Sequence, residues 1–276
     1  MIKEISPNKI KDCIPYSSDP QMAMVLASII EGNTRAQFWQ ATQSANSSVC
    51  LLWDKGNNVV YLLGDTLSPE ATQELAHLIS TQIKEQAVQE ELVRFDVRAL
   101  SPALEEAIPR IFQGVEFHQT SKLFYVLRQD RILTQAVPTK AAVQYALIDQ
   151  AFLEQDHLQH LQYLKAEIVA MWPSQTTFCE RGFGYAALVA DTIVCWCTAE
   201  YVSAKTCGIG IETIQEYQGK GIATATATHF VAHCLEHNIT PYWECNSHNS
   251  ASIRVAEKVG FERIQKSAFW KGMFQC

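Results

Sequence analysis

A glycine-containing loop is the segment of this sequence whose residue types point most directly to chemistry. The stretch from Cys207 to Thr224 reads CGIGIETIQEYQGKGIAT, a β-branched run that leads into Gly219 and Gly221 and then at once into a helix-forming run. Glycines let the backbone approach a ligand closely and aim several N–H groups at one point. A helix N-terminus adds unpaired N–H groups and a positive dipole end. Together these features suit a pyrophosphate, with Lys220 near the phosphates or at the rim.

The spacing within this loop differs from two familiar phosphate-binding patterns. A P-loop requires Gly-Lys-Ser/Thr, whereas Lys220 is followed by Gly221. A Rossmann fingerprint requires G-x-G-x-x-G, whereas Thr224 occupies the position of its last glycine. On glycine spacing alone, a plain strand–turn–helix connection therefore stays open as the alternative.

Two motifs in the same order make the second half of the chain similar to the GNAT-type N-acetyltransferases. The stretch from Gln218 to Ala223 resembles the Gln/Arg-x-x-Gly-x-Gly/Ala signature, whose backbone amides hold the pyrophosphate of acetyl-CoA in that superfamily. The stretch from Asn249 to Phe261 resembles the element Asn-x-x-Ala-x-x-x-Tyr-x-x-x-Gly-Phe, in which the Asn contacts the pantetheine region in many members. The resemblance covers residues 140–270 and implies acetyl-CoA (CoA) as the cofactor.

A narrower likeness, to the group of the zwittermicin A resistance acetyltransferase, lies in residues 182–186, 210–214, 234–236 and 241–246. It implies direct transfer to a primary amine of a small, antibiotic-like molecule in a ternary complex. The resemblance also implies that main-chain N–H groups near Thr213 and Ile214 polarise the thioester carbonyl. The residues that it assigns to the cofactor are Thr213, Ile214, Gln218, Gly219, Lys220, Gly221, Ile222, Ala223, Thr224, Asn249 and Ser252.

One departure from the superfamily pattern matters for the chemistry. The frequent Tyr that protonates the departing thiolate is Ala256 in this chain. The general acid is therefore unassigned, and solvent could serve, because a thiol of pKa about 8.5 leaves with little help. The departure leaves open a non-catalytic acyl-CoA-binding or regulatory protein. A different acyl donor, such as succinyl- or propionyl-CoA, stays open as well.

Two carboxylates are candidates for the catalytic base. An alkyl amine of pKa about 10.4 is protonated at neutral pH, so a base must remove its proton before transfer. Glu212 shares one side of its strand with Gly208 and Gly210, which predicts an open trough beside it. Glu244 is the competitor, as a substrate ligand or second carboxylate; its strand is implied to splay from the preceding one and admit the acyl-pantetheine arm. The alternatives are an ion pair for Glu212 and a solvent-facing or structural position for Glu244.

The histidines and cysteines do not form a recognisable metal-binding pattern. His229, His233 and His237 lie four residues apart, but no acidic partner or HExxH pattern completes a zinc site, so we expect them at the boundary of the core or exposed. The pair Cys195 and Cys197 lacks the two-residue gap of a zinc knuckle. His248 is either a substrate or cofactor contact or a solvated loop residue.

Composition limits the class of protein. With 276 residues, 47% hydrophobic and 18% charged, the chain is globular, and a net charge of -7 argues against nonspecific binding to nucleic acid. No run approaches the roughly 18 apolar residues of a membrane span, and the N-terminus lacks the apolar region of a secretory signal. The nine scattered cysteines suggest reduced thiols. We therefore expect a cytoplasmic protein without a membrane or nucleic-acid partner, whose oligomeric state stays open, a homodimer included.

Hydrophobic periodicity and turn residues predict two α/β (α+β) domains, 1–135 and 136–276, joined in the polar stretch 128–140. For the second we expect a GNAT-like mixed, mostly antiparallel sheet flanked by helices. The first lacks the cofactor loop and is expected to be a degenerate copy that either completes the acceptor pocket or only packs against the catalytic domain. The predicted strands are 49–53, 59–63, 92–97, 123–127, 143–148, 184–189, 193–202, 206–214, 242–246 and 261–269. The predicted helices are 20–31, 68–83, one from 101, 158–171, 222–236 and 250–259.

Overall fold

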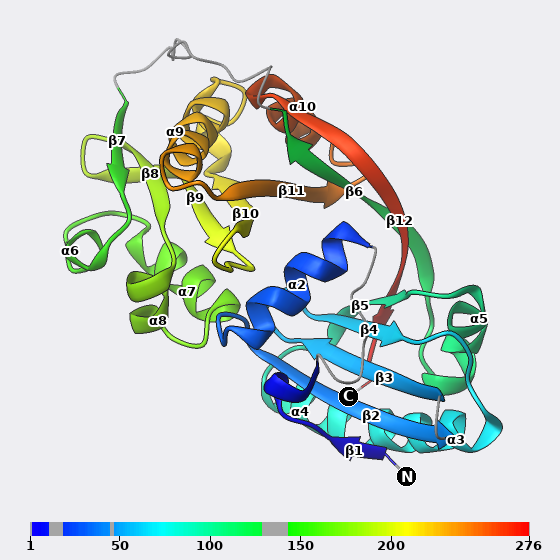
Figure 1. The fold of residues 1–276 in the computed structure, drawn as a ribbon. Helices are drawn as coiled ribbons and strands as arrows, with labels where there is room; N and C mark the ends of the chain where they lie inside the picture. The colour runs from blue at the N-terminus through cyan, green and yellow to red at the C-terminus, as the bar shows by residue number, and fades with distance from the viewer. Residues whose placement is uncertain (1, 11–18, 45–46, 129–142, 276) are drawn as a thin grey trace. The chain divides into compact units, whose positions relative to one another are not determined.

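The structure is a computed structural model that describes residues 2–10, 19–44, 47–128 and 143–275 (Figure 1). It contains two compact units. Unit 1 comprises the described residues up to Ser121 together with those from Ala268 onward, and unit 2 extends from Lys122 to Ser267. The domain boundary predicted between residues 135 and 136 lies outside the described residues.

Unit 1 is built on a mixed sheet in the order β1-β2-β3-β4-β5-β12. Neighbouring strands are antiparallel except β4 and β5, which are parallel and connected through helices. The strands are β1 (Ile2–Glu4), β2 (Ala36–Ser44), β3 (Ser47–Asp54), β4 (Val59–Leu63) and β5 (Arg94–Ala99), with the end of β12 (Phe261–Met273). The helices are η1 (Pro7–Lys9), α2 (Pro20–Ile30), α3 (Pro69–Leu78), η2 (Ile79–Ile83), α4 (Lys84–Gln89) and α5 (Pro102–Ile111).

The helix starts of unit 1 follow the predicted capping rules. Ser68 caps α3, its hydroxyl accepting a hydrogen bond from the Ala71 N–H at 3.1 Å, and Pro69 occupies the first helical position. The helix predicted over 68–83 is longer than expected, because one π-helical turn, η2, leads directly into α4. Strand β2 was not predicted from the sequence.

Unit 2 has the sheet order β7-β8-β9-β10-β11-β6, antiparallel except for the parallel pair β10 and β11. The strands are β7 (Gln144–Leu147), β8 (Gly184–Val189), β9 (Thr192–Glu200), β10 (Thr206–Thr213), β11 (Thr240–Asn246) and the second part of β6 (His118–Leu127). The helices are α6 (Gln150–Leu153), α7 (Leu161–Met171), α8 (Gln175–Arg181), η4 (Gln215–Tyr217), α9 (Ile222–Glu236) and α10 (Ser250–Val259). Helix α8 was not predicted, and the helix predicted over 158–171 begins at Leu161.

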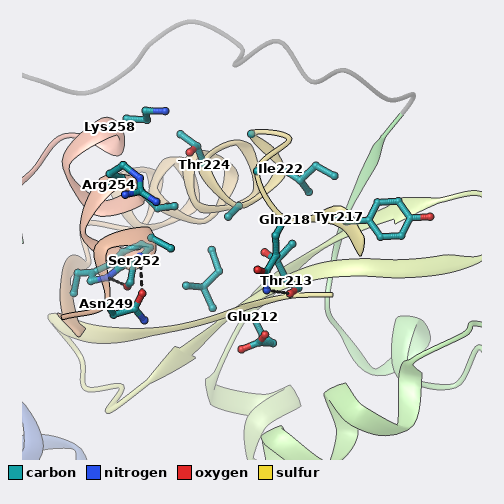
Figure 2. Close-up of a pocket in the computed structure, with 17 residues that line it drawn as sticks. Glu212, Thr213, Tyr217, Gln218, Ile222, Thr224, Asn249, Ser252, Arg254 and Lys258 are labelled. Atoms are coloured by element: carbon teal, nitrogen blue, oxygen red, sulfur yellow. Dashed lines mark hydrogen bonds between the residues drawn. The ribbon is translucent and has the colours of Figure 1, made fainter. Parts of the chain in front are cut away.

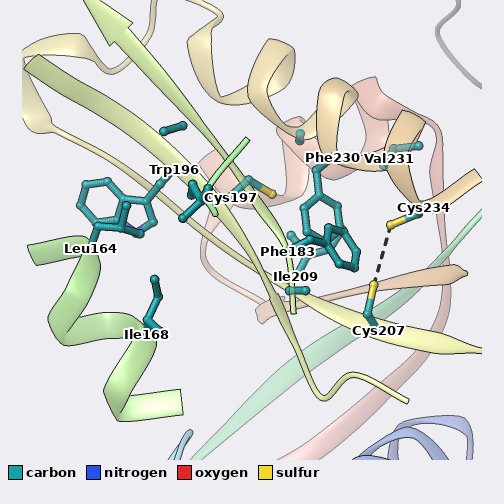
Figure 3. Packing of buried hydrophobic residues seen from close by; sticks show 14 of the residues in the cluster. Leu164, Ile168, Phe183, Trp196, Cys197, Cys207, Ile209, Phe230, Val231 and Cys234 are labelled. Atoms are coloured by element: carbon teal, nitrogen blue, oxygen red, sulfur yellow. Dashed lines mark hydrogen bonds between the residues drawn. The ribbon is translucent and has the colours of Figure 1, made fainter. Parts of the chain in front are cut away.

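The core of unit 2 lies on both sides of its sheet. Figure 3 shows Leu164 and Ile168 of α7 on the side that carries Trp196, and Phe230 and Val231 of α9 on the other side. All of these side chains are buried. The two faces of β9 and β10 are therefore covered by different helices, which separates a face toward α9 from a face toward α7.

Each unit repeats the same element order. In unit 1 the order is β2-β3-β4-α3-β5-α5-β6, and in unit 2 it is β8-β9-β10-α9-β11-α10-β12. The last strand of each series passes into the other sheet: β6 pairs with β11 from Lys122 to Val126, and β12 pairs with β5 from Trp270 to Met273. The repeated order supports the expected degenerate copy of the fold.

The described part of the chain contains no helix with the length and apolar character needed to cross a membrane. Its cysteines are free thiols, and most of them are buried. Burial raises the pKa of the Cys195 thiol to about 11, so this group stays protonated and unreactive near neutral pH.

Candidate active site

A cavity of about 420 Å³ lies where β10 and β11 separate (Figure 2). These strands pair only at Thr206 with Thr240 and at Cys207 with Pro241. Beyond that point, β10, β11, the loop before α9 and the first turns of α10 form the walls of the cavity. Of the residues predicted for the site, Glu212, Thr213, Gln218, Gly219, Gly221, Ile222, Ala223, Thr224, Asn249 and Ser252 line it, whereas Ile214, Lys220 and Glu244 do not.

The start of α9 is open toward this cavity. Gly219 (φ 72°) and Gly221 (φ 83°) both have the left-handed backbone conformation that favours glycine, and Gly221 is the N-cap residue. No side chain in the described part of the chain caps this helix, and its first turn carries no acidic residue. The first N–H groups of α9 and its positive dipole end are therefore available to an anion.

Two side-chain contacts fix the shape of the loop. Gln218 Nε2 donates a hydrogen bond to the main-chain oxygen of Thr213 at 3.0 Å, which ties the loop to the end of β10. The Lys220 Nζ lies 4.7 Å from the centre of the Tyr217 ring, in a cation–π contact. Lys220 is thus held at the rim rather than in the wall of the cavity.

The main-chain amides at the end of β10 are not equivalent. The Ile214 N–H donates to the Val194 oxygen at 3.0 Å, so it is occupied by the sheet. In an antiparallel ladder, alternate residues direct their polar groups to opposite neighbours. The Thr213 N–H and the Ile211 N–H therefore point away from β9 and toward the gap, in agreement with the bond that Thr213 accepts from Gln218.

Helix α10 supplies the opposite wall and residues that sequence reasoning missed. Asn249 caps this helix by accepting from the Ser252 N–H at 3.0 Å, and Ser252 Oγ accepts from Trp243 Nε1 at 2.9 Å. Arg254 and Lys258, one turn apart, also line the cavity and place two cations there. Both follow Ala251, another residue of the cavity wall, at three and seven residues on one helix face, and this spacing is the signal that could have revealed them.

Glu212 lies on the α7-facing side of β10. It is exposed, lines the cavity, and in Figure 2 points away from α9 and the loop. In the described part of the chain its carboxylate has no hydrogen bond or ion pair, unlike the structural pairing considered from the sequence. The trough expected beside it is not open, because a Cβ on Gly210 would collide with the Glu200 carboxylate and lie 3.2 Å from Thr198 Oγ1.

Glu244 shares the sheet face of Glu212 but is already paired. Pro241 is the parallel partner of Cys207, so the residues that alternate with them, Glu244 and Glu212, share the other face. Glu244 Oε1 lies 3.2 Å from the Nζ of Lys122 on β6. Glu244 therefore differs from Glu212 in two respects: it has an ion-pair partner, and it does not line the cavity.

A third carboxylate, Glu167 on α7, was not recognised from the sequence. Its Oε2 accepts a hydrogen bond from Trp196 Nε1 at 2.6 Å, and its Oε1 accepts from Thr198 Oγ1 at 3.3 Å. Burial raises the pKa of Glu167 above its ordinary value; these two bonds oppose the rise and the charge of Glu212 adds to it. An acidic residue between the buried Leu164 and Ile168 on one helix face was the available signal.

The remaining candidates are placed as follows. Ala256, at the position of the frequent Tyr, is fully buried and offers no proton donor. His233 stacks on Phe183 at 4.4 Å and on His237 at 4.1 Å, and His229 stacks on Tyr145 at 4.4 Å. Within the described residues no group of three or more His, Cys, Asp or Glu side chains is arranged to hold a metal ion. His248 is exposed after β11 and does not line the cavity.

The chain belongs to the GNAT acetyltransferase family, whose model matches residues 15–269. It is 33% identical over 113 residues to an uncharacterized N-acetyltransferase, YdfB, of Bacillus subtilis (strain 168); the match covers 41% of this chain and only 43% of that relative. The family match confirms the resemblance drawn from the two motifs. The narrower likeness to the zwittermicin A resistance group stays a prediction.

Solved structures share the fold over nearly the whole chain. A GCN5-related N-acetyltransferase-like protein from Streptococcus suis 89/1591 has a TM-score of 0.66 and 17% identity, covering 97% of this chain and 100% of that one. A tandem GNAT protein from the clavulanic acid biosynthesis pathway has a TM-score of 0.56 and 12% identity, covering 98% of each chain. These structures confirm the GNAT-like mixed α/β fold and the arrangement in two domains.

Proposed function

We propose that this protein transfers an acetyl group from acetyl-CoA directly to a primary amine of a small molecule, with both bound at once. One observation carries the proposal: the open N-terminus of α9 and the gap between β10 and β11 meet in a single cavity. The first feature fits a diphosphate and the second fits a narrow, extended arm. Acetyl-CoA has both parts.

The residues of the cavity would divide the work along the cofactor. The N–H groups at the start of α9 hold the diphosphate, and Arg254 and Lys258 neutralise phosphate charge. Acetyl-CoA, when bound, supplies the activated acetyl group. The Thr213 N–H, with the Ile211 N–H further back along the strand, donates to the thioester oxygen and stabilises negative charge that develops there.

Glu212 is the proposed base. It takes the proton of the acceptor ammonium, directly or through a water, and leaves the free amine that can attack. The amine nitrogen then bonds to the acetyl carbon, the carbon–sulfur bond breaks, and the nitrogen gives up its second proton to solvent to become the amide. Ala256 cannot protonate the departing thiolate, so its proton comes from solvent. Unlike Glu244, Glu212 reaches the cavity and carries no counter-ion within the described chain.

Three finer features belong to the same proposal. The acceptor is a small molecule that is cationic before reaction, which fits the carboxylates Glu212 and Glu200 on one sheet face. The free thiols of the described chain suit the cytoplasm. Whether unit 1 contributes to acceptor binding stays a prediction.

Calorimetry and a thiol-release assay test the proposal in two stages. We expect saturable heat on titrating CoA into the protein, and thiol release from acetyl-CoA on adding members of an amine panel. No heat with CoA would overturn the cofactor site. Heat without thiol release on any amine would favour a CoA-binding protein without turnover, and competition by succinyl- or propionyl-CoA would identify a different donor.

A further inference from the structure

Glu167 accepts hydrogen bonds from β9, the strand that pairs with β10, which carries the proposed base Glu212. Glu167 extends from α7 to two consecutive residues on the same face of β9, Trp196 and Thr198. Both are almost fully buried, with exposures of 3%. A carboxylate that accepts from an indole N–H and a hydroxyl is a strong acceptor, so it fixes the orientation of both side chains.

The register of the sheet places these two side chains next to Glu212. Trp196 is the antiparallel partner of Glu212, and Thr198 is the partner of Gly210. Because Ile214 donates to Val194, the ladder alternation makes Trp196 and Glu212 a hydrogen-bonded pair as well. Cross-strand partners on one face have Cβ atoms about 5 Å apart, so the position of the indole limits where the Glu212 side chain can lie.

The two carboxylates also interact through their charges. The charge that raises the pKa of Glu167 is that of Glu212 on β10, and Glu167 in turn raises the pKa of the thiols Cys195 and Cys197 on β9, on the second of which Glu200 also acts. Lys165 on the same helix is directed to Asp156, at 3.6 Å. Glu212 is thus the neighbouring charge that acts on Glu167.

We infer that Glu167 is a positioning residue for Glu212: by holding the Trp196 indole through its hydrogen bond, it sets where the base carboxylate stands at the cavity. This role rests on the proposed function for its effect on turnover. The link between Glu167, Trp196 and Glu212 is independent of turnover and is measurable without it. Glu167 itself is not expected to touch acetyl-CoA, since it does not line the cavity.

Kinetics of paired variants test the effect on turnover. Glu167→Ala removes the acceptor and is expected to lower kcat about tenfold to a hundredfold, the scale of a small misplacement of a catalytic group. The affinity for CoA should stay within twofold. Glu167→Gln keeps an oxygen that accepts the indole N–H and should restore kcat to within about threefold. Gln162→Ala, an exposed change on the same helix, is the matched control.

A double-variant cycle shows whether the effect passes through the indole. Trp196→Phe should lower kcat like Glu167→Ala, and the double variant should be no worse than either single variant, because both remove one linkage. Additive losses, an unchanged kcat in Glu167→Ala, or a Glu167→Gln variant as slow as Glu167→Ala would each overturn the inference. A parallel loss of CoA affinity would indicate a purely structural role and overturn it too.

Tryptophan emission gives a readout that needs no turnover. The emission of Trp196, taken as the difference between the wild type and Trp196→Phe, should titrate at a pH above the ordinary range of a glutamate and lose this titration in Glu167→Gln. In Glu212→Gln the midpoint should fall, since a negative charge that raises the pKa of Glu167 is gone. A midpoint unaffected by Glu212→Gln overturns the inference. If the wild type releases no thiol, the proposed function is wrong. The emission measurement then still tests the link between Glu167, Trp196 and Glu212.

Discussion

The two units place the same junction, a strand followed by a helix, at the same point of the same element order, yet only the junction of unit 2 has the uncapped helix start that the proposed diphosphate site requires. In unit 1 it is β4 followed by α3, and in unit 2 it is β10 followed by α9. Both helices connect a parallel pair of strands. The local differences between the two junctions are therefore the features on which the proposed cofactor site depends.

The first feature is the start of the helix. In α3, Ser68 satisfies one N–H, Pro69 has none to offer, and Glu70 puts a negative charge in the first turn. Hydrogen bonds from the backbone and from Ser68 lower the pKa of Glu70, so that it stays ionised there. The positive end of α3 is satisfied from within, whereas the N-cap of α9 is Gly221, which has no side chain to satisfy that end.

The second feature is the separation of the parallel strands. In unit 1, β4 stays paired with β5 at four successive positions, from Val59 to Leu62, and every residue of β4 is buried. In unit 2, β10 and β11 pair at two positions and then part. Only the second arrangement leaves the gap that the proposed cofactor arm would enter. The proposed site therefore needs more than the fold: it combines an uncapped helix start with an unpaired strand edge.

Giving α9 the acidic start of α3 should have the largest effect. Ala223→Glu introduces a carboxylate at the wall where the diphosphate is proposed to bind. Like charges brought together in this way cost several kcal/mol, so we expect CoA affinity to fall about a hundredfold or more. Isothermal calorimetry measures the change. The exposed Ala232→Glu, further along α9, is the control and should bind CoA normally. Equal affinity in both variants would contradict the assignment of the diphosphate to this end.

The next effect concerns the strands themselves, because β4 has no carboxylate, whereas β10 carries Glu212. Glu212→Gln should lower kcat about a hundredfold, the usual contribution of a general base, with little change in CoA affinity. Glu244→Gln should lower kcat no more than about threefold, because Glu244 is held by Lys122 outside the cavity wall. Steady-state kinetics on one amine suffice. A larger loss in the Glu244 variant would reverse the two assignments.

The smallest effect concerns acid stability. Burial lowers the pKa of His229 and of His233 in unit 2, so the folded unit binds these protons less readily than the unfolded chain. The neutral imidazoles contribute fully to the free energy of unfolding above the ordinary histidine pKa of about 6.5. This stability is lost as the pH falls through the lowered pKa values that the two histidines have in the folded protein. Glu70 in unit 1 loses its contribution only at lower pH, below its own ordinary range. Acid should therefore weaken unit 2 first.

Urea denaturation between pH 7 and pH 4 checks this order. His229→Phe with His233→Phe keeps aromatic rings for stacking but removes the titration, and should flatten the loss of stability between pH 7 and pH 5. Glu70→Gln should leave that interval unchanged. A wild-type midpoint that is constant down to pH 5 would show that these imidazoles are not desolvated in the folded protein.

Local patterns in the sequence were sufficient for part of this picture. The glycines at 219 and 221, the cap at Ser68 and the motif beginning at Asn249 act within a few residues, so their geometry could be predicted from spacing. The Glu200 carboxylate over Gly210, the Lys122 partner of Glu244 and the bonds of Glu167 depend on register and on packing between distant segments. Such pairings leave no periodic trace in a single sequence, which explains why the trough was expected to be open.

The passage of β6 and β12 into each other's sheets has a consequence for how the chain matures. The sheet of unit 1 is incomplete until Trp270–Met273 have been synthesised, more than 170 residues after β5. Until then β5 keeps a bare edge, and edges of this kind invite association with other chains. Unit 1 can therefore complete its sheet only after the final strand has been synthesised. Truncation near the C-terminus should destabilise unit 1 more than it destabilises the loop before α9.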